Sequence, residues 1–197
     1  DEDKMDGKFS PVVTSTSPIN GVSSVSTDTA ISVIFSEEMS SSSLTTNTSD
    51  TTCSGSTQLS SDNFTTCVQM SSSPTVTNSN KTFTVTPSSR LPYGTNYKVR
   101  LDNVINSNSG KNLPSVYITP QGFTSINITI SSTSPSDAQI SVDTATNISV
   151  TLSEPVDIST VTTNTSNTSC SGTFQVSSDN FSTCVQMSDS PTVSNSN

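Results

Sequence analysis

The stretch CSGSTQLSSDNFTTCVQM, residues 53–70, returns almost letter for letter as CSGTFQVSSDNFSTCVQM, residues 170–187. The two stretches lie 117 positions apart and align without a gap. Extended to residues 53–80 and 170–197, the alignment has 22 identical residues out of 28. A repeat of this length is too long for a solenoid unit and has the size of one small domain. The sequence therefore predicts two tandem copies of one domain, with a repeat of about 117 residues.

Each copy holds two cysteines, Cys53 and Cys67 in the first and Cys170 and Cys184 in the second. Four cysteines allow three pairings, and the duplication favours the pairing within each copy. A hairpin that turns at the SSDN sequence would bring the two cysteines of a copy together across neighbouring strands. A zinc site is the alternative, but the chain has no C-x-x-C motif and the pairs belong to separate copies. We predict two disulfides, which indicate an oxidising compartment such as the periplasm, cell surface or medium.

The composition is unusually polar, with 78 Ser and Thr among 197 residues, 28% hydrophobic residues and no Trp or His. Such a composition can indicate disorder, because little apolar surface is available to offset chain entropy. Here, however, the apolar residues form short alternating runs that one face of a β-sheet can bury. The expected inward-facing residues are Ile31, Val33, Phe35, Phe83, Val85, Tyr97, Val99 and Leu101, and in the second copy Ile148, Val150 and Leu152.

The runs predict an all-β protein with about seven short strands per domain, the pattern of an immunoglobulin-like β-sandwich. One of the expected elements is the QLSSDNFTTCVQM hairpin, and another is a last strand near GFTSINITI that continues into the second copy. The charged start of the chain lacks periodicity and is expected to be a flexible leader. The predicted organisation is a leader at 1–10, a first domain at 11–124 and a second domain at 125–197.

The second copy is predicted to be incomplete, because nothing in it corresponds to residues 81–124 of the first. A sandwich without these strands would expose its core and its strand edges. We expect a truncated domain whose natural protein continues with more repeats. The alternative is strand exchange, in which a partner chain or the segment 81–124 itself supplies the missing strands.

The formal net charge is −9, and all seven basic residues lie before residue 112. This negative net charge argues against electrostatic binding to nucleic acid or to an anionic membrane. No stretch approaches the roughly 20 apolar residues that span a bilayer, so no membrane insertion is expected.

The strand-end motifs resemble one known family. TSTSPINGVSSVSTDTAISVIFSEEM at 14–39, its counterpart SSTSPSDAQISVDTATNISVTLSEPV at 131–156, and LPYGTNYKVRL at 91–101 are similar to the bacterial Ig-like domains first described in S-layer proteins. The second copy departs where Ala138 replaces Gly21, so that turn is expected to differ. The resemblance implies a tandem, surface-exposed structural or adhesive module of a bacterial envelope or secreted protein.

The sequence shows no arrangement of catalytic residues. Without His, a Ser-His-Asp or Cys-His arrangement cannot form. Glu37 and Glu38 are adjacent carboxylates, but in the second copy Glu154 is followed by Pro155, so the pair is not repeated. We predict that the chain is not an enzyme.

Calcium is the metal that the recurring acidic residues suggest. Asp62 and Asp179 recur in the SSDN turns, and Glu37 and Glu154 recur at the ends of strands, all as hard oxygen donors. No EF-hand-like loop accompanies them, and an ordinary Asx turn is the favoured explanation of the SSDN sequence.

The function expected from these observations is that of a structural spacer or adhesive module in an exported, multi-repeat bacterial surface protein. Its expected partners are neighbouring Ig-like repeats and a host surface protein or glycan. The alternatives are a glycan- or matrix-protein-binding module and an accessory domain of a secreted hydrolase. In each case the predicted location is extracellular or at the cell surface.

Overall fold

The computed structural model describes residues 9–194, and the chain divides into two compact units, Asp1–Asn127 and Ile128–Asn197. The first eight residues of the predicted leader lie outside the described range. Unit 1 extends past Thr124, where the sequence placed its end. The Ser125 N–H donates to Thr95 O at 3.0 Å and the Ile126 N–H to Val25 O at 2.8 Å, and these bonds attach both residues to unit 1.

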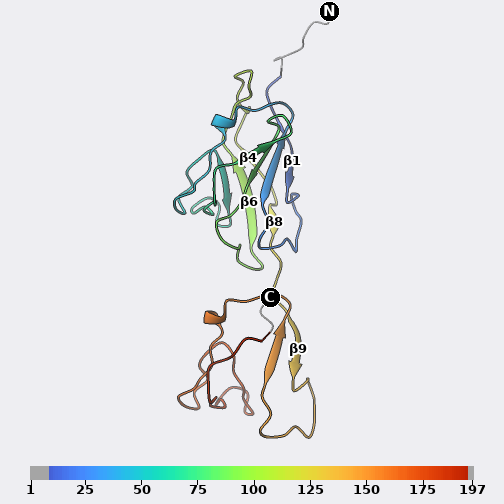
Figure 1. Ribbon diagram of the computed structural model, residues 1–197, viewed down its shortest axis with the longest axis vertical. Helices are drawn as coiled ribbons and strands as arrows, with labels where there is room; N and C mark the ends of the chain where they lie inside the picture. Colours follow the sequence, from blue (N-terminus) through green and yellow to red (C-terminus); the bar gives the residue numbers. More distant parts are fainter. Residues whose placement is uncertain (1–8, 195–197) are drawn as a thin grey trace, which may run out of the picture. The chain divides into compact units, whose positions relative to one another are not determined.

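The first sheet of unit 1 has four strands in the order β1-β2-β5-β4, all antiparallel (Figure 1). The strands are β1 (Val13–Ser17), β2 (Ile31–Phe35), β5 (Thr82–Val85) and β4 (Thr75–Thr77). In the central pair, Ile31 lies opposite Val85 and Val33 lies opposite Phe83. The alternation read from the sequence therefore puts apolar residues on the same face of both strands.

The second sheet is built around β6 (Asn96–Leu101), the longest strand. One edge of β6 pairs with β3 (Thr57–Ser60), and its other edge pairs with two short strands, β7 (Tyr117–Ile118) and β8 (Phe123–Thr124). All of these pairings are antiparallel. Unit 1 therefore has two antiparallel sheets, and the predicted all-β, Ig-like sandwich is confirmed.

One hydrophobic core lies between the sheets and includes all eight inward-facing residues predicted for the first copy. Phe35 and Phe83 meet edge to face with ring centroids 5.9 Å apart, and Tyr97 stacks on Phe123 at 5.7 Å. Pairs of this kind add stability beyond the burial of their area. Burial also raises the pKa of the Tyr97 hydroxyl, although Thr95 opposes the shift by a hydrogen bond.

Two predicted elements of unit 1 are wrong in detail. The expected QLSSDNFTTCVQM hairpin contains only β3, and Cys53 and Cys67 both lie outside strands. Side-chain oxygens of Ser60 and Asp62 accept hydrogen bonds from the N–H groups of the turn. The Cys67 and Met70 N–H groups of the return segment then donate to Thr51 O and Asn47 O rather than to β3. The expected last strand near GFTSINITI is divided into β8, which belongs to unit 1, and β9 (Ile130–Ser134), which belongs to unit 2.

Regular structure in the described part of unit 2 consists of an antiparallel pair, β9 with β10 (Ser149–Leu152), and one turn of 3-10 helix, Ile158–Thr160 (Figure 1). This pair corresponds to β1 and β2 of unit 1. The counterparts of β3 and β4, residues 174–177 and 192–194, are not strands. In unit 1 these two strands pair with β6 and β5, and no described residue of unit 2 corresponds to either. A similar sequence thus forms a strand only where a partner strand is present.

Candidate functional site

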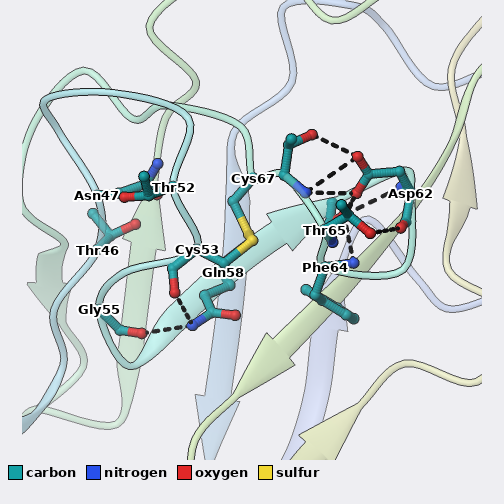
Figure 2. The surroundings of a disulfide bond; sticks show 12 residues. Thr46, Asn47, Thr52, Cys53, Gly55, Gln58, Asp62, Phe64, Thr65 and Cys67 are labelled. Carbon is teal, nitrogen blue, oxygen red and sulfur yellow. Dashed lines mark hydrogen bonds between the residues drawn. A yellow bond between two sulfur atoms is a disulfide. The ribbon is translucent and has the colours of Figure 1, made fainter.

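The most elaborate local structure in unit 1 is residues 47–70, which we call the clamped loop. A disulfide joins Cys53 to Cys67 with an S–S distance of 2.06 Å and a Cα–Cα distance of 4.9 Å (Figure 2). In unit 2 a disulfide joins Cys170 to Cys184 with the same Cα–Cα distance, 4.9 Å. Both bonds lie within a copy, as the duplication predicted.

Backbone hydrogen bonds fix the two ends of the clamped loop to each other. The Cys67 N–H donates to Thr51 O at 2.9 Å, and the Met70 N–H donates to Asn47 O at 2.8 Å. The Val68 N–H donates to Leu59 O at 2.8 Å, which attaches the return of the loop to β3. The disulfide therefore closes a loop that is already tied to the second sheet.

Asp62 organises the turn that follows β3. Its carboxylate accepts hydrogen bonds from the Ser60 hydroxyl at 2.8 Å, the Thr66 hydroxyl at 2.6 Å and the Thr66 N–H at 2.9 Å. The Thr65 N–H donates to it as well, at 3.1 Å. Asn63 and Phe64 adopt positive φ angles of 61° and 64°, a conformation that this bonding holds in place.

The hydrogen bonds to the Asp62 carboxylate lower its pKa from 3.8 to about 2. The Thr66 hydroxyl has the largest effect, followed by the Thr66 N–H and the Ser60 hydroxyl, because each of them stabilises the charged form. A carboxyl group whose pKa is lower in the folded state stabilises the fold above its unfolded pKa. That contribution is lost as the pH falls toward the folded pKa.

We therefore expect the Asp62→Asn variant to be less stable than the unchanged protein at about pH 5, and the difference to shrink as the pH falls to about 2. Asparagine keeps the shape but not the charge, so the comparison isolates the carboxylate. The midpoints of urea unfolding of both proteins, at a series of pH values, measure this difference in stability. A difference that stays constant over this range would contradict the assignment.

Gln58 and Gly55 shape the other side of the clamped loop. The Gln58 side-chain amide donates to Gly55 O at 2.9 Å and to Cys53 O at 3.1 Å, so this β3 residue binds the backbone beside the disulfide (Figure 2). Gly55 has a φ of +86°, and a Cβ there would lie 2.7 Å from Thr46 Cα. Both the backbone angle and the available space at this position require glycine.

Replacing Gly55 with alanine is accordingly expected to destabilise unit 1 by more than about 1 kcal/mol. Gly110 provides a matched control, since its φ is +82° but a Cβ there meets no atom within 4 Å. The Gly110→Ala variant carries the backbone strain alone and should lose less stability. Thermal unfolding of both variants measures the difference, and equal losses would show that close packing at Gly55 is unimportant.

The same network recurs in unit 2. Asp179 accepts hydrogen bonds from the Ser177 hydroxyl at 2.8 Å and the Thr183 hydroxyl at 2.6 Å, and these bonds lower its pKa to about 2. The Gln175 amide donates to Gly172 O at 2.7 Å. The local sequence therefore specifies this loop in both copies.

One contact of the clamped loop has no counterpart among the described residues of unit 2. The Arg100 guanidinium of β6 lies over the Phe64 ring, 5.7 Å from its centroid. The residue that corresponds to Phe64 is Phe181, and no arginine of the described residues is recorded over its ring. The side chain of Phe181 is 58% exposed.

The calcium candidates are not brought together. Glu37 and Glu154 lie just after β2 and β10, whereas the Asp62 and Asp179 carboxylates are occupied by donors of their own turns. Within residues 9–194, no three His, Cys, Asp or Glu side chains gather closely enough to hold a metal ion. Calcium binding at Glu37, Asp62, Glu154 and Asp179 stays a prediction from the sequence. No described helix is long and apolar enough to cross a membrane.

The sequence reasoning missed the supporting residues of the clamped loop. Asn47 is 3% exposed and donates through its amide to Asp50 O at 2.8 Å, and Asn164 does the same to Asn167 O at 2.7 Å. Gln58, Ser60 and Thr66 also have identical counterparts 117 positions later. Their identity between the copies was the signal that could have revealed them.

Comparison with protein families identifies the fold of unit 1. Residues 8–125 match the family described as "Bacterial Ig-like domain". These residues are more than half of the chain, and the chain therefore belongs to the bacterial Ig-like domain family. This result confirms the resemblance read from the strand-end motifs. A comparison with curated proteins finds no match.

Among solved structures, the chain is similar to the N-terminal part of the bacterial S-layer protein SbsC. The TM-score is 0.43 with 19% identity, covering 64% of this chain and 26% of that chain. It is also similar to the S-layer protein rSbsC(31-844) and to domains 1–6 of SbsC, with TM-scores of 0.41 and 0.42 and 20% identity. Each of these two matches covers 64% of this chain and 15% of that chain. The chain thus corresponds to about a quarter or less of these S-layer chains.

Proposed function

We propose that this chain is a non-catalytic structural module of an exported bacterial protein, and that its role is to act as a stable spacer at the cell surface. Membership of the bacterial Ig-like domain family supports a structural role in bacteria. The two disulfides support an oxidising location outside the cytoplasm.

The observation that carries the proposal is the use of polar groups in the clamped loop. Asp62, Gln58 and Asn47 direct their side chains to groups of their own loop. Asn47 and Gln58 are moreover buried, so their amide groups are not presented to solvent. In this loop they hold the backbone in one conformation instead, which favours stability over ligand binding.

The clamp also compensates for the small core of a polar chain. Closing a loop of about 15 residues stabilises a domain by roughly 3 kcal/mol in the chain-entropy model. The free energy of unfolding of a whole domain is typically about 5–15 kcal/mol, so the disulfide supplies a substantial part of it. A disulfide-closed loop in each repeat is a suitable arrangement for a spacer that must persist outside the cell.

The location is tested on the native protein in its own cells. We expect an antibody against unit 1 to label intact cells, and alkylation without reductant to modify no cysteine. After reduction, all four cysteines should be modified. Labelling only after lysis, or free thiols before reduction, would contradict the proposed location.

The spacer role is tested separately from the location. The full chain is applied to a panel of glycans and matrix proteins, and no saturable binding is expected. Saturable binding to one member of the panel would overturn the spacer role and favour a glycan- or matrix-protein-binding module. Discovery of a hydrolase domain in the same polypeptide would favour the accessory role.

A further inference from the structure

The connection between β1 and β2 contains a tight turn, residues 19–22, which holds the one Asn-Gly pair of the sequence. The Val22 N–H donates to Ile19 O at 3.1 Å, and Gly21 has a φ of +84°. Asn20 does not lie in the positive-φ region. These features define a type II turn with Asn20 and Gly21 at its two central positions.

The Asn20 side chain holds this turn against the segment that leads into β8. Its Oδ1 accepts hydrogen bonds from the Gln121 N–H and the Gly122 N–H, both at 2.9 Å. Its amide donates to Gln121 Oε1 at 3.4 Å. The Gly21 N–H donates to Gly122 O. We call these four hydrogen bonds the Asn20 latch.

The surroundings of the Asn20 latch leave Gly21 little freedom. A Cβ on this glycine would lie 2.6 Å from Gln121 Oε1, so the Gln121 side chain lies directly against the Gly21 backbone. Next to the latch, the Thr124 N–H donates to Val22 O at 2.8 Å and the Val25 N–H donates to Thr124 O at 3.1 Å. The turn is therefore fixed to β8 as well.

An Asn-Gly pair has a chemistry of its own. Asparagine is a thermolabile residue, and a following glycine has no side chain to hinder attack by its backbone nitrogen. The Gly21 nitrogen gives its proton to hydroxide and forms a bond to Asn20 Cγ. The bond from Cγ to Nδ2 then breaks, and Nδ2 takes a proton from water and leaves as ammonia. Water opens the resulting succinimide at either carbonyl carbon, which leaves aspartate or isoaspartate at position 20.

The folded turn keeps the two reacting atoms apart. In a type II turn the second residue has a ψ of about +120°. Closure of the five-membered ring requires the Gly21 nitrogen to eclipse Asn20 Cβ, and this ψ holds the nitrogen far from that position. The Gly21 N–H is also bound to Gly122 O, and the Asn20 carboxamide is fixed by its own hydrogen bonds. The reaction therefore requires the latch to open.

We propose that Asn20 is a modification site controlled by the latch: its amide is retained while the turn is docked and is lost as ammonia when the turn detaches. Local opening of a surface segment needs less free energy than global unfolding, so it occurs in the folded protein. Isoaspartate adds a carbon to the main chain and shortens the side chain. The modified turn then cannot restore the four hydrogen bonds, and this end of unit 1 stays loosened.

The second copy has no equivalent reactive pair. The residues that correspond to Asn20 and Gly21 are Asp137 and Ala138. A turn still closes there, since the Gln139 N–H donates to Ser136 O at 3.1 Å. Aspartate has no amide to lose as ammonia, and the alanine side chain hinders attack. The modification is therefore specific to unit 1.

The test follows the conversion of Asn20 at mildly alkaline pH by peptide mapping and mass spectrometry. Three samples are compared: the folded full chain, the full chain in concentrated urea with its disulfides intact, and a peptide with the sequence of residues 14–27. We expect similar rates in the peptide and in urea, and a rate at least about tenfold lower in the folded chain. Asn108, which is exposed and precedes Ser109, is the internal reference and should differ less between the samples.

Two variants of Gln121 separate the parts of the latch. Gln121→Pro removes the N–H that binds Asn20 Oδ1, and we expect the folded chain to react about fivefold faster. Gln121→Ala keeps this N–H and removes only the side chain over Gly21, so the rate should rise by about twofold. The control is Gln69→Ala, which removes an amide that binds Thr48 O in the clamped loop and should leave the rate unchanged. Circular dichroism shows whether each variant is folded.

The consequence of the modification is measured on the aged protein after ion-exchange separation. Amide hydrogen exchange at Gln121 and Gly122 should be faster in the isoaspartate form, because their acceptor is displaced. The Asn20→Asp variant keeps the length of the main chain and an oxygen in the same position, and it should keep the slow exchange of the unchanged protein. Equally slow exchange in the isoaspartate form would show that the latch closes again, contrary to the proposal.

Four rate measurements would also overturn the proposal. Equal rates in the folded chain and the peptide would mean that the latch does not protect Asn20. A faster reaction in the folded chain would mean that the two N–H donors activate the carboxamide. Slowing of Asn108 to the same extent would identify an effect of the solvent. No reaction in the peptide would mean that the Asn-Gly pair is not a modification site.

Discussion

Replacing Phe35 with alanine is expected to lower the free energy of unfolding of unit 1 by about 3–5 kcal/mol. Phe35 is 2% exposed, and its ring meets the Phe83 ring edge to face across β2 and β5. Truncation removes this contact and leaves a cavity that the two sheets cannot fully close. Chemical unfolding of the variant and the unchanged protein, followed by circular dichroism, measures the difference.

The second copy supplies a matched control for this variant. Leu152 is the counterpart of Phe35 and is only half-buried. We therefore expect Leu152→Ala to leave the main unfolding transition within about 0.5 kcal/mol of its original value, as for a substitution outside a packed core. If the two alanine variants lost equal stability, the core would not be concentrated in unit 1 as the structure shows.

Replacing both Cys53 and Cys67 with serine is expected to lower the stability of unit 1 by about 3 kcal/mol. For a domain of this size such a loss corresponds to a fall in Tm of roughly 10 °C. The double replacement avoids a single unpaired thiol that could form bonds between molecules. Differential scanning calorimetry under non-reducing conditions measures the shift.

The control for this prediction is the other disulfide. Replacing Cys170 and Cys184 with serine should leave the Tm of unit 1 unchanged, because that bond lies within unit 2. It should make residues 170–184 more susceptible to proteolysis. A Tm of the Cys53/Cys67 variant within about 2 °C of the unchanged protein would show that the hydrogen bonds of the loop suffice without the disulfide.

The alternating runs of the sequence were sufficient to predict the central strands. Val33 and Phe83 recur in patterns with a period of two, and this period by itself assigns them to the buried face of a strand. The disulfide pairing was also predictable, because the repetition of Cys53 and Cys67 as Cys170 and Cys184 favours one of three pairings. These features depend on local spacing, which a sequence displays directly.

The loop between the cysteines was not predicted correctly. The SSDN sequence indicated a turn, but the Ser60 and Asp62 side chains accept the backbone N–H groups of Phe64 and Thr66. The Cys67 and Met70 N–H groups of the return segment donate to Thr51 O and Asn47 O rather than to β3, so the second strand of the expected hairpin does not form. Competition between a side chain and a ladder for the same N–H group depends on where each atom lies in space. Residue type alone therefore does not reveal which acceptor binds a given N–H group.

The sequence by itself determined the repeat, the faces of the central strands and the pairing of the cysteines. Only the tertiary structure decided the different outcomes for Ile31 and Ile148, and for residues 57–60 and 174–177. These pairs have similar local sequences, yet among the described residues one member of each is covered or paired and the other is not. A strand obtains its hydrogen bonds and its burial from segments distant in sequence, so its neighbours rather than its own residues determine whether it forms.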